Sequence, residues 1–191
     1  MEHSVVFAGF GGQGLLFAGQ ILARAAIKDG LEVFWIPSYG PEMRGGTASC
    51  TVIIGEDEIG SPVVDRYEAA VVMNPPSLTR FAPRVAPEGL LIVNSSLAAD
   101  AASGRGDVQE LRLACTELAA RAGDDKLVSV VALGALVGSR RWVSEGAVAE
   151  AIREVVGAKR PHVLEADLAA FQAGVAAASA AAAPAEAATA V

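Results

Sequence analysis

The chain has 191 residues, a length that suits one domain with a full hydrophobic core. Its 15 Lys and Arg residues against 22 Asp and Glu residues give a net charge of −7, which argues against a broad nucleic-acid-binding surface. No apolar run reaches the roughly 18 residues that a membrane span needs, and the first residues show no secretory signal pattern. We therefore expect a cytoplasmic protein with neither a membrane nor a nucleic-acid partner.

Apolar residues make up 52% of the chain and aromatic residues only 5%, so the core consists mainly of Val, Leu, Ile and Ala. This composition is typical of buried parallel strands covered by Ala-rich helices. The two cysteines, Cys50 and Cys115, are far apart and form no CxxC pair. A four-cysteine iron–sulfur or zinc site within this chain is therefore excluded.

The sequence of the first half predicts a strand, a glycine turn and a helix, followed by two more strands. Residues 4–8 form the first strand, and residues 31–36 form a second strand that Pro37 is expected to end. Residues 47–54 alternate between apolar and polar side chains, which predicts a half-covered strand with a brief antiparallel partner near Ile59. The order strand, helix, strand indicates a Rossmann-like start.

The second half of the chain predicts further buried strands and several helices. The expected elements are strands at 69–73 and 90–93, a short helix opened by Pro75 and Pro76, a helix from a capping box at Asp107 and Glu110 to Ala122, an internal helix at 127–137, a helix capped by Ser144, and a last helix at about 163–174. Residues 176–191 are mostly Ala and predict a disordered tail. The fold class is α/β, a three-layer α/β/α domain over residues 1–175 with a mostly parallel, mixed sheet.

The segment Gly9-Phe10-Gly11-Gly12-Gln13-Gly14 has the GxGxxG spacing of a dinucleotide-binding turn. A dinucleotide site also needs an acidic residue at the end of the second strand to hold the ribose. Here that strand ends in Phe34-Trp35-Ile36-Pro37, without a carboxylate. Three interpretations stay open: an NAD or FAD site, a tight turn packed on the sheet, or a backbone-lined contact with a partner chain or a phosphate-bearing ligand.

A second motif, Tyr39-Gly40-Pro41-Glu42-Met43-Arg44-Gly45-Gly46, follows the second strand. Its glycines let the backbone approach a ligand or another chain closely. Glu42 and Arg44 add a carboxylate acceptor and a planar guanidinium donor. The two could instead pair with each other at the surface, where such a pair contributes under about 1 kcal/mol. We interpret the segment as a recognition loop.

Together with Leu15-Leu16-Phe17-Ala18-Gly19 and Ser61-Pro62, the two motifs resemble the gamma subunit of 2-oxoacid:ferredoxin (acceptor) oxidoreductases. This is the family of the pyruvate, 2-oxoglutarate, 2-oxoisovalerate and arylpyruvate enzymes. The resemblance covers about residues 4–175. One departure is Ser129, where family members often carry Asn.

The resemblance implies a multi-subunit enzyme that converts a 2-oxoacid to its acyl-CoA and passes electrons to ferredoxin or another acceptor. The complex is expected to use thiamine diphosphate, Mg²⁺, iron–sulfur clusters and coenzyme A. The chain itself has no Gly-Asp-Gly motif for the metal of the thiamine cofactor and no cysteine set for a cluster. We therefore expect no catalytic residue, metal or cofactor in this chain.

The expected partners are the alpha and beta (thiamine-binding) subunits and an iron–sulfur subunit of the same complex. The chain would dock against them and shape the region through which substrate and coenzyme A enter. The residues expected at this contact are Gly9, Gly11, Gly12, Gln13, Gly14, Tyr39, Gly40, Glu42, Arg44, Gly45 and Gly46. Two other functions stay open: a stand-alone nucleotide-binding reductase and a purely structural scaffold subunit.

Overall fold

The computed structural model describes residues 1–39, 47–157 and 163–182, and for Tyr39 and Thr47 it describes only the backbone. The strands over these residues are β1 (Glu2–Phe10), β2 (Glu32–Tyr39), β3 (Thr47–Gly55), β4 (Tyr67–Val72), β5 (Val85–Asn94) and β6 (Gln109–Leu113). They form one six-stranded sheet in the order β2-β3-β1-β4-β5-β6. β3 is antiparallel to both β1 and β2, whereas the other three neighbouring pairs are parallel.

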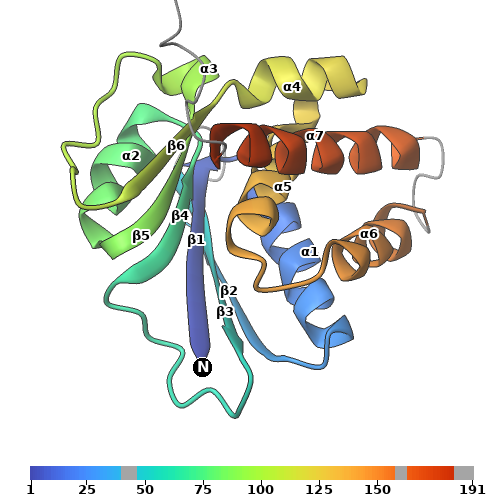
Figure 1. Ribbon diagram of the computed structural model, residues 1–191, viewed down its shortest axis with the longest axis horizontal. Coiled ribbons are helices and arrows are strands. Elements are labelled where there is room, and N and C mark those ends of the chain that lie inside the picture. Colours follow the sequence, from blue (N-terminus) through green and yellow to red (C-terminus); the bar gives the residue numbers. More distant parts are fainter. Residues whose placement is uncertain (40–46, 158–162, 183–191) are drawn as a thin grey trace, which may run out of the picture.

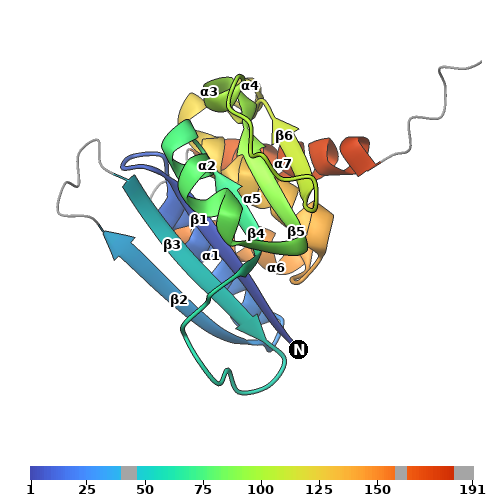
Figure 2. The same cartoon turned by 90° about the vertical axis from the view of Figure 1, so that its left-hand side faces the viewer.

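Helices cover both faces of this sheet. They are α1 (Leu15–Lys28), α2 (Pro75–Phe81), α3 (Ser95–Ala98), α4 (Cys115–Ala122), α5 (Val128–Arg140), α6 (Glu145–Ile152) and α7 (Leu164–Ala182). The first helix and α4 to α7 pack on one face, and α2 and α3 pack on the other (Figures 1 and 2). The expected three-layer α/β/α architecture with a mostly parallel, mixed sheet is confirmed.

The core is divided into two layers by the central strands. In β1, Val5 and Phe7 pack toward α1 and α5, whereas Val6 and Ala8 pack toward α2, because successive side chains of a strand alternate between the faces. The predicted internal helix is α5, in which every residue from Val128 to Val137 is buried. A helix with neighbours on every side has no need of a polar face.

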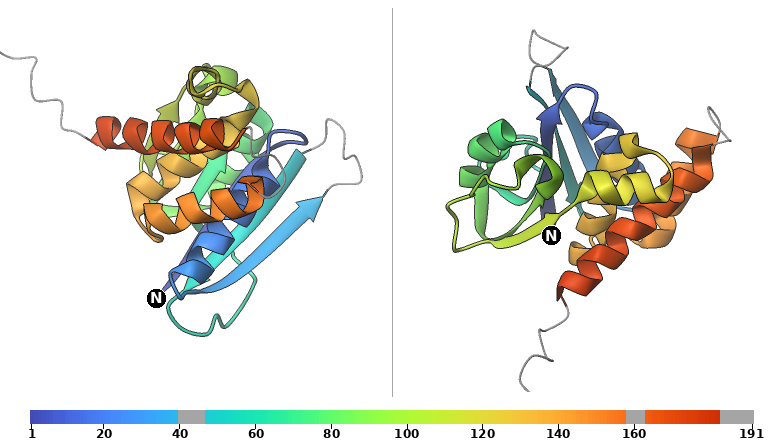
Figure 3. Two further views of the ribbon diagram at one scale, coloured as in Figure 1. Left: turned by 90° about the vertical axis from the view of Figure 1, so that its right-hand side faces the viewer. Right: turned by 90° about the horizontal axis from the view of Figure 1, so that it is seen from above.

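Glycines bring the backbones of α5 and α7 into direct contact. A Cβ atom at Gly134 would lie 2.1 Å from the carbonyl oxygen of Phe171, and one at Gly174 would lie 1.9 Å from that of Val131. Figures 1 and 3 show α7 lying across α5. Any side chain at either glycine would push the two helices apart, so this contact fixes the outer helical layer.

The helix predicted from Asp107 to Ala122 is wrong in its first part, which forms β6 before α4 begins at Cys115. Asp107 caps no helix; Arg105 donates to both of its carboxylate oxygens, and this pairing holds the pKa of Asp107 below its ordinary value. Leu111 faces the core in the strand as it would have in a helix. The apolar residues of this segment fit the period of a strand as well as that of a helix. The segment forms a strand because it pairs with the free edge of β5.

Two further expectations in the first half need correction. β3 has β1 and β2 as its partners, and no strand forms at Ile59. Pro37 does not end β2, which continues to Tyr39. This strand lies at the sheet edge, where the missing N–H of a proline costs no ladder hydrogen bond.

The last helix extends beyond its predicted end. α7 continues to Ala182, so the prediction of disorder is wrong for residues 176–182, while residues 183–191 lie outside the described part of the chain. Ala178 is buried because its methyl group fits against Gly138 of α5. Of the helices described, none combines the length and the apolar character needed to cross a membrane.

The α5–α7 contact predicts that Gly174→Ala lowers the free energy of unfolding by about 1–3 kcal/mol or more, because the added methyl group meets backbone atoms that cannot move independently. Gly60→Ala is the matched control, since no atom of the part of the chain that the structure describes lies within 4 Å of a Cβ atom there. It should change stability by less than about 0.5 kcal/mol. Urea denaturation of both variants provides the measurement, and equal stability of the two would contradict the close contact.

Candidate functional site

The first glycine motif forms the turn from β1 into α1 and is tied together by Gln13. The side-chain Oε1 of Gln13 accepts a hydrogen bond from the backbone N–H of Phe10 at 2.7 Å, and the Gln13 N–H donates to the Phe10 carbonyl oxygen at 3.3 Å. The turn therefore closes on itself through one side chain. Its surface is formed by Phe10, Gly11 and Gly12, which are exposed.

The glycines of this turn are required for different physical reasons. Gly12 and Gly14 have φ angles of +97° and +73°, in the left-handed region that favours glycine. A Cβ atom at Gly14 would also lie 2.5 Å from Ser129 Oγ of α5, and one at Gly9 would lie 2.9 Å from Met73 Cβ. At Gly12 no atom of the described residues lies within 4 Å of such a Cβ atom. Packing therefore explains Gly9 and Gly14, whereas Gly12 is exposed and is explained by its left-handed conformation.

The sheet register places the two strand ends that flank the second motif at the same end of the sheet as the first motif. Ala48 of β3 pairs with Gly9 of β1 on one side and with Tyr39 of β2 on the other, and Phe10 pairs with Thr47. The connection between Tyr39 and Thr47 therefore starts and ends beside the glycine turn. Gly40, Glu42, Arg44, Gly45 and Gly46 lie in this connection, outside the described residues, as does the Tyr39 side chain.

Two buried asparagines that sequence analysis did not select occupy the same edge of the sheet. Asn74 and Asn94 follow or end the parallel strands β4 and β5, and each is 1% exposed. Asn74 Oδ1 accepts a hydrogen bond from the Ser77 N–H at 2.9 Å, and Asn94 Oδ1 accepts from the N–H groups of Ser96 and Cys115, both at 3.2 Å. Each asparagine thus fixes the chain where it leaves the sheet. The sequence pattern of Asn74 before two prolines is typical of a helix N-cap.

A further hydrogen-bond chain connects α3 to α4 at this edge. Ser96 Oγ donates to the carboxylate of Glu117 and accepts from the Thr116 N–H at 3.1 Å. The hydrogen bond from Ser96 holds the pKa of Glu117 below its ordinary value. The carboxyl ends of β1, β4 and β5 are thus followed by rigid turns.

The strand order of this sheet differs from the order that a dinucleotide-binding site needs. β1 and β4 are neighbours whose following helices, α1 and α2, lie on opposite faces, which is the arrangement at which α/β sheets bind ligands. In the dinucleotide fold the second strand lies beside the first and carries the ribose-binding acid. Here β3 separates β1 from β2, so the end of β2 is one strand further away.

The described residues do not fit the metal groups that the resemblance implies. No cluster of three or more His, Cys, Asp or Glu side chains occurs within residues 1–39, 47–157 and 163–182. Cys50 and Cys115 are free thiols in the core, and burial raises the pKa of each to about 12. Cys50 instead donates to the Leu15 carbonyl oxygen at 3.3 Å, which ties β3 to the first turn of α1.

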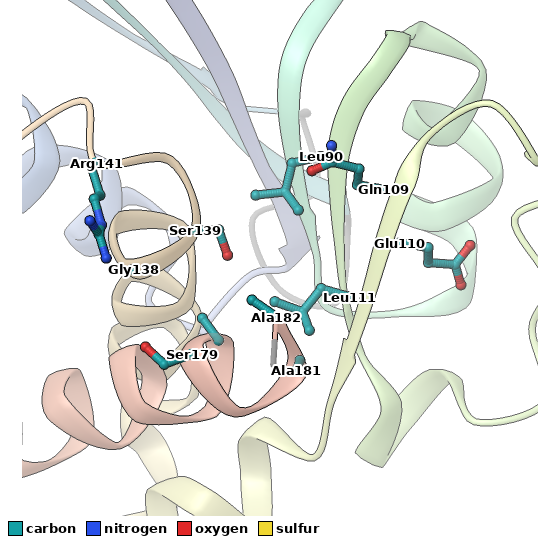
Figure 4. A pocket seen from close by; sticks show the side chains of 11 residues that line it. Leu90, Gln109, Glu110, Leu111, Gly138, Ser139, Arg141, Ser179, Ala181 and Ala182 are labelled. Carbon is teal, nitrogen blue, oxygen red and sulfur yellow. The ribbon is translucent and has the colours of Figure 1, made fainter. Parts of the chain in front are cut away.

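A pocket of about 620 Å³ lies away from this edge, where β6 begins and where α5 and α7 end (Figure 4). Its charged lining residues, Arg141 and Glu110, lie on opposite sides of it. Glu110 also accepts a hydrogen bond from Arg112 Nε at 2.6 Å. The pocket therefore lacks converging polar groups, and the glycine turn with its neighbouring strand ends remains the candidate site.

Comparison with known proteins decides the family. Residues 4–177 match the family described as pyruvate ferredoxin/flavodoxin oxidoreductase. The chain belongs to this family. The resemblance inferred from the glycine motifs is thereby confirmed.

Relatives of this family member include subunits of 2-oxoacid oxidoreductases. The chain is 37% identical over 174 residues to ketoisovalerate oxidoreductase subunit VorA of Methanothermobacter thermautotrophicus, covering 91% of this chain and 36% of that protein. It is 36% identical over 180 residues to 2-oxoglutarate synthase subunit KorC of the same organism, covering 91% of this chain and 94% of that protein. The chain therefore spans about a third of the ketoisovalerate relative and nearly all of the 2-oxoglutarate relative.

A solved structure supports the same family. The gamma subunit of a keto/oxoacid ferredoxin oxidoreductase from Geobacter sulfurreducens superposes with a TM-score of 0.81 at 30% identity, covering 93% of this chain and 99% of that one. A 2-oxoglutarate:ferredoxin oxidoreductase from Magnetococcus marinus shares the fold with a TM-score of 0.86 at 23% identity, and 31% of that chain is covered. The domain thus occurs both as a separate chain and as one part of a longer chain.

The turn geometry predicts different costs for alanine at two of its glycines. Gly12→Ala should lower the free energy of unfolding by about 1–2 kcal/mol, the cost of a left-handed conformation alone. Gly14→Ala should cost about 1–3 kcal/mol more, because its methyl group also overlaps Ser129 Oγ. Combining Gly14→Ala with Ser129→Ala should recover that additional cost in a double-mutant cycle. Equal costs at the two glycines, or no recovery, would contradict this account of the turn.

Proposed function

We propose that the chain is the gamma subunit of a 2-oxoacid:ferredoxin (acceptor) oxidoreductase, which oxidatively decarboxylates a 2-oxoacid to its acyl-CoA. The observation that carries this proposal is the match to separate gamma-type subunits along nearly their whole length, at 94% of the 2-oxoglutarate relative and 99% of the Geobacter sulfurreducens gamma subunit. The substrate class follows from the relatives, whose names specify ketoisovalerate and 2-oxoglutarate.

In this proposal the chemistry takes place on partner subunits. The enzyme class uses thiamine diphosphate, Mg²⁺ and iron–sulfur clusters, and the donor set of the described residues fits neither the metal nor a cluster. The proposed partners are the alpha and beta subunits that bind the thiamine cofactor and an iron–sulfur subunit, with ferredoxin or another acceptor receiving the electrons. We derive no chemical step within this chain.

The proposed role of the chain is to present its two glycine motifs to the thiamine-binding partner, beside the route of the substrate or coenzyme A. The exposure of Gly11 and Gly12 and the register of Ala48 with both Gly9 and Tyr39 support this role. Glu42 and Arg44 would supply specific polar contacts, and Gly40, Gly45 and Gly46 would allow close approach of the backbone. The stand-alone reductase is less well supported, because β3 lies where the second dinucleotide-binding strand would be.

Reconstitution tests the subunit assignment. The purified chain alone should show no iron–sulfur absorbance and no oxidation of pyruvate, 2-oxoglutarate or aryl 2-oxoacids with coenzyme A, because it lacks the groups that carry these reactions. Adding the alpha, beta and iron–sulfur subunits of the same organism should restore acceptor reduction with one of these substrates. Activity of the single chain, or full activity of the complex without it, would overturn the proposal.

A substitution in the second motif separates a functional contact from a scaffold. Arg44→Ala should lower kcat/KM for coenzyme A or the stability of the complex by well over tenfold, because loss of one member of a desolvated charged pair costs about 3–5 kcal/mol. Arg24→Ala is the matched control, since Arg24 is exposed on α1. Steady-state kinetics and subunit co-purification provide the measurements. Activity of the Arg44 variant within about twofold of wild type would assign the motif to ordinary surface.

A further inference from the structure

A further pocket lies at the edge of the sheet opposite the glycine turn. It has a volume of about 350 Å³ and is lined by the amino ends of β1, β4 and β5 and by the segment in which α5 ends. Small-molecule sites commonly have volumes of about 300–1,000 Å³ and a few polar groups that face one ligand. We name this space the amino-edge pocket.

His3 joins an aromatic wall of the amino-edge pocket to a carboxylate. Its Nδ1 donates to Oε2 of Glu68 at 2.7 Å, and its ring stacks on Trp142 with a centroid distance of 4.9 Å and an interplanar angle of 9°. Trp142 follows Arg141, which ends α5 in a left-handed conformation with a φ of 54°, and precedes the buried Val143. The backbone on both sides of Trp142 is therefore held in place, and so is this wall.

Arg140 brings a positive charge to the same pocket. Its Nη2 donates to the carbonyl oxygen of Glu88 at 3.2 Å, whereas its buried Nε has no hydrogen-bond partner among the described residues. A buried guanidinium N–H without a partner costs free energy. The planar guanidinium binds a carboxylate better than other groups, because it can donate two parallel hydrogen bonds to it. A carboxylate is thus the group that this wall is suited to bind.

Glu88 places a second carboxylate at the rim of the pocket. Its φ is 62°, a conformation that is strained for a residue with a Cβ atom, and its N–H donates to the Asp107 carbonyl oxygen at 2.7 Å. The side chain is exposed, and its carboxylate forms no hydrogen bond or ion pair with the residues that the structure describes. A charged side chain held at a strained position suggests that the charge has a use.

We propose that the amino-edge pocket binds a zwitterionic α-amino acid with an apolar side chain. Its carboxylate would lie at Arg140, its ammonium group at Glu68 and Glu88, and its side chain against Trp142. Because charges of both signs line one pocket, a ligand with a single charge would leave the opposite sign unpaired. This inference does not rest on the proposed function, since the pocket and the glycine turn lie at opposite ends of the sheet.

A metal ion is a less suitable occupant. No group of three or more His, Cys, Asp or Glu side chains that could hold one occurs among residues 1–39, 47–157 and 163–182. A purely structural network is also less suitable. It would account for the contact between His3 and Glu68, but it would leave the Arg140 Nε and the Glu88 carboxylate without a partner.

Three probes of one shape test which charges the pocket recognises. L-Valine carries both charges, isobutylamine carries only the ammonium group, and isovalerate carries only the carboxylate. Isothermal titration calorimetry of the full chain should give a Kd of about 1 mM or lower for L-valine. Isobutylamine and isovalerate should each bind at least about tenfold more weakly, because each lacks one set of charged hydrogen bonds.

Tryptophan fluorescence shows where the ligand binds. The chain has two tryptophans, Trp35 and Trp142. In Trp35→Phe, L-valine should change the remaining emission with the same midpoint that calorimetry gives. In Trp142→Phe that change should be absent, because Trp35 lies on β2 and does not line the pocket.

Substitutions that remove a charge test the two ends of the ligand separately. Glu88→Gln and Arg140→Gln should each weaken L-valine binding by at least about tenfold. Glu88→Gln keeps every backbone contact of this residue, so its thermal midpoint should stay within about 3 °C of wild type. Glu165→Gln is the matched control, since Glu165 is exposed in the first turn of α7 and does not line the pocket. It should bind L-valine within about twofold of wild type.

Three results would overturn the inference. They are the absence of saturable L-valine binding up to about 10 mM, equal affinity for L-valine and a probe with one charge, and unchanged L-valine binding by Glu88→Gln. Each is measured on the full chain without other subunits. The outcome is therefore distinct from that of the reconstitution experiment, which tests the proposed function.

Discussion

The hydrogen-bond register of β3 is the constraint on which the candidate site depends. Because Ala48 pairs with Gly9 on one side and with Tyr39 on the other, the first glycine motif lies at the same end of the sheet as the two strand ends that flank the second. A shift of this register by one residue would turn Cys50 and Val52 away from the core. Cys50 reinforces the register, since its thiol donates to the Leu15 carbonyl oxygen at the start of α1. Core packing and site geometry are therefore set by the same strand.

The inserted strand also explains why a fingerprint-like turn does not make a dinucleotide site here. The turn has the required glycines, yet Gln13 folds back onto Phe10 and β3 occupies the position next to β1. Gly9 and Gly14 are explained by contacts with Met73 and Ser129 within the domain. The same glycine spacing thus serves packing at these two positions, whereas Gly12 is exposed.

The two faces of the sheet differ in how tightly helices pack on them. α5 and α7 approach through Gly134 and Gly174 so closely that their backbones touch, which makes this side of the domain a fixed support. The opposite side is thinner, because α2 and α3 leave β2 and β3 uncovered. The two faces of the sheet are therefore covered unequally by the described helices.

The sequence by itself determined the features that depend on neighbouring residues. Runs of apolar residues identified the buried strands and α5, Ser144 identified the start of α6, and the two glycine motifs identified the family. Tertiary structure decided the features that depend on distant partners. The segment before Cys115 became β6 because β5 offered a free edge, and residues 176–182 became helical because α5 offered Gly138 as a place for Ala178. Asn94 gained its hydrogen bond from the Cys115 N–H only because the end of β5 meets the start of α4, since local periodicity contains no information about which segments are neighbours.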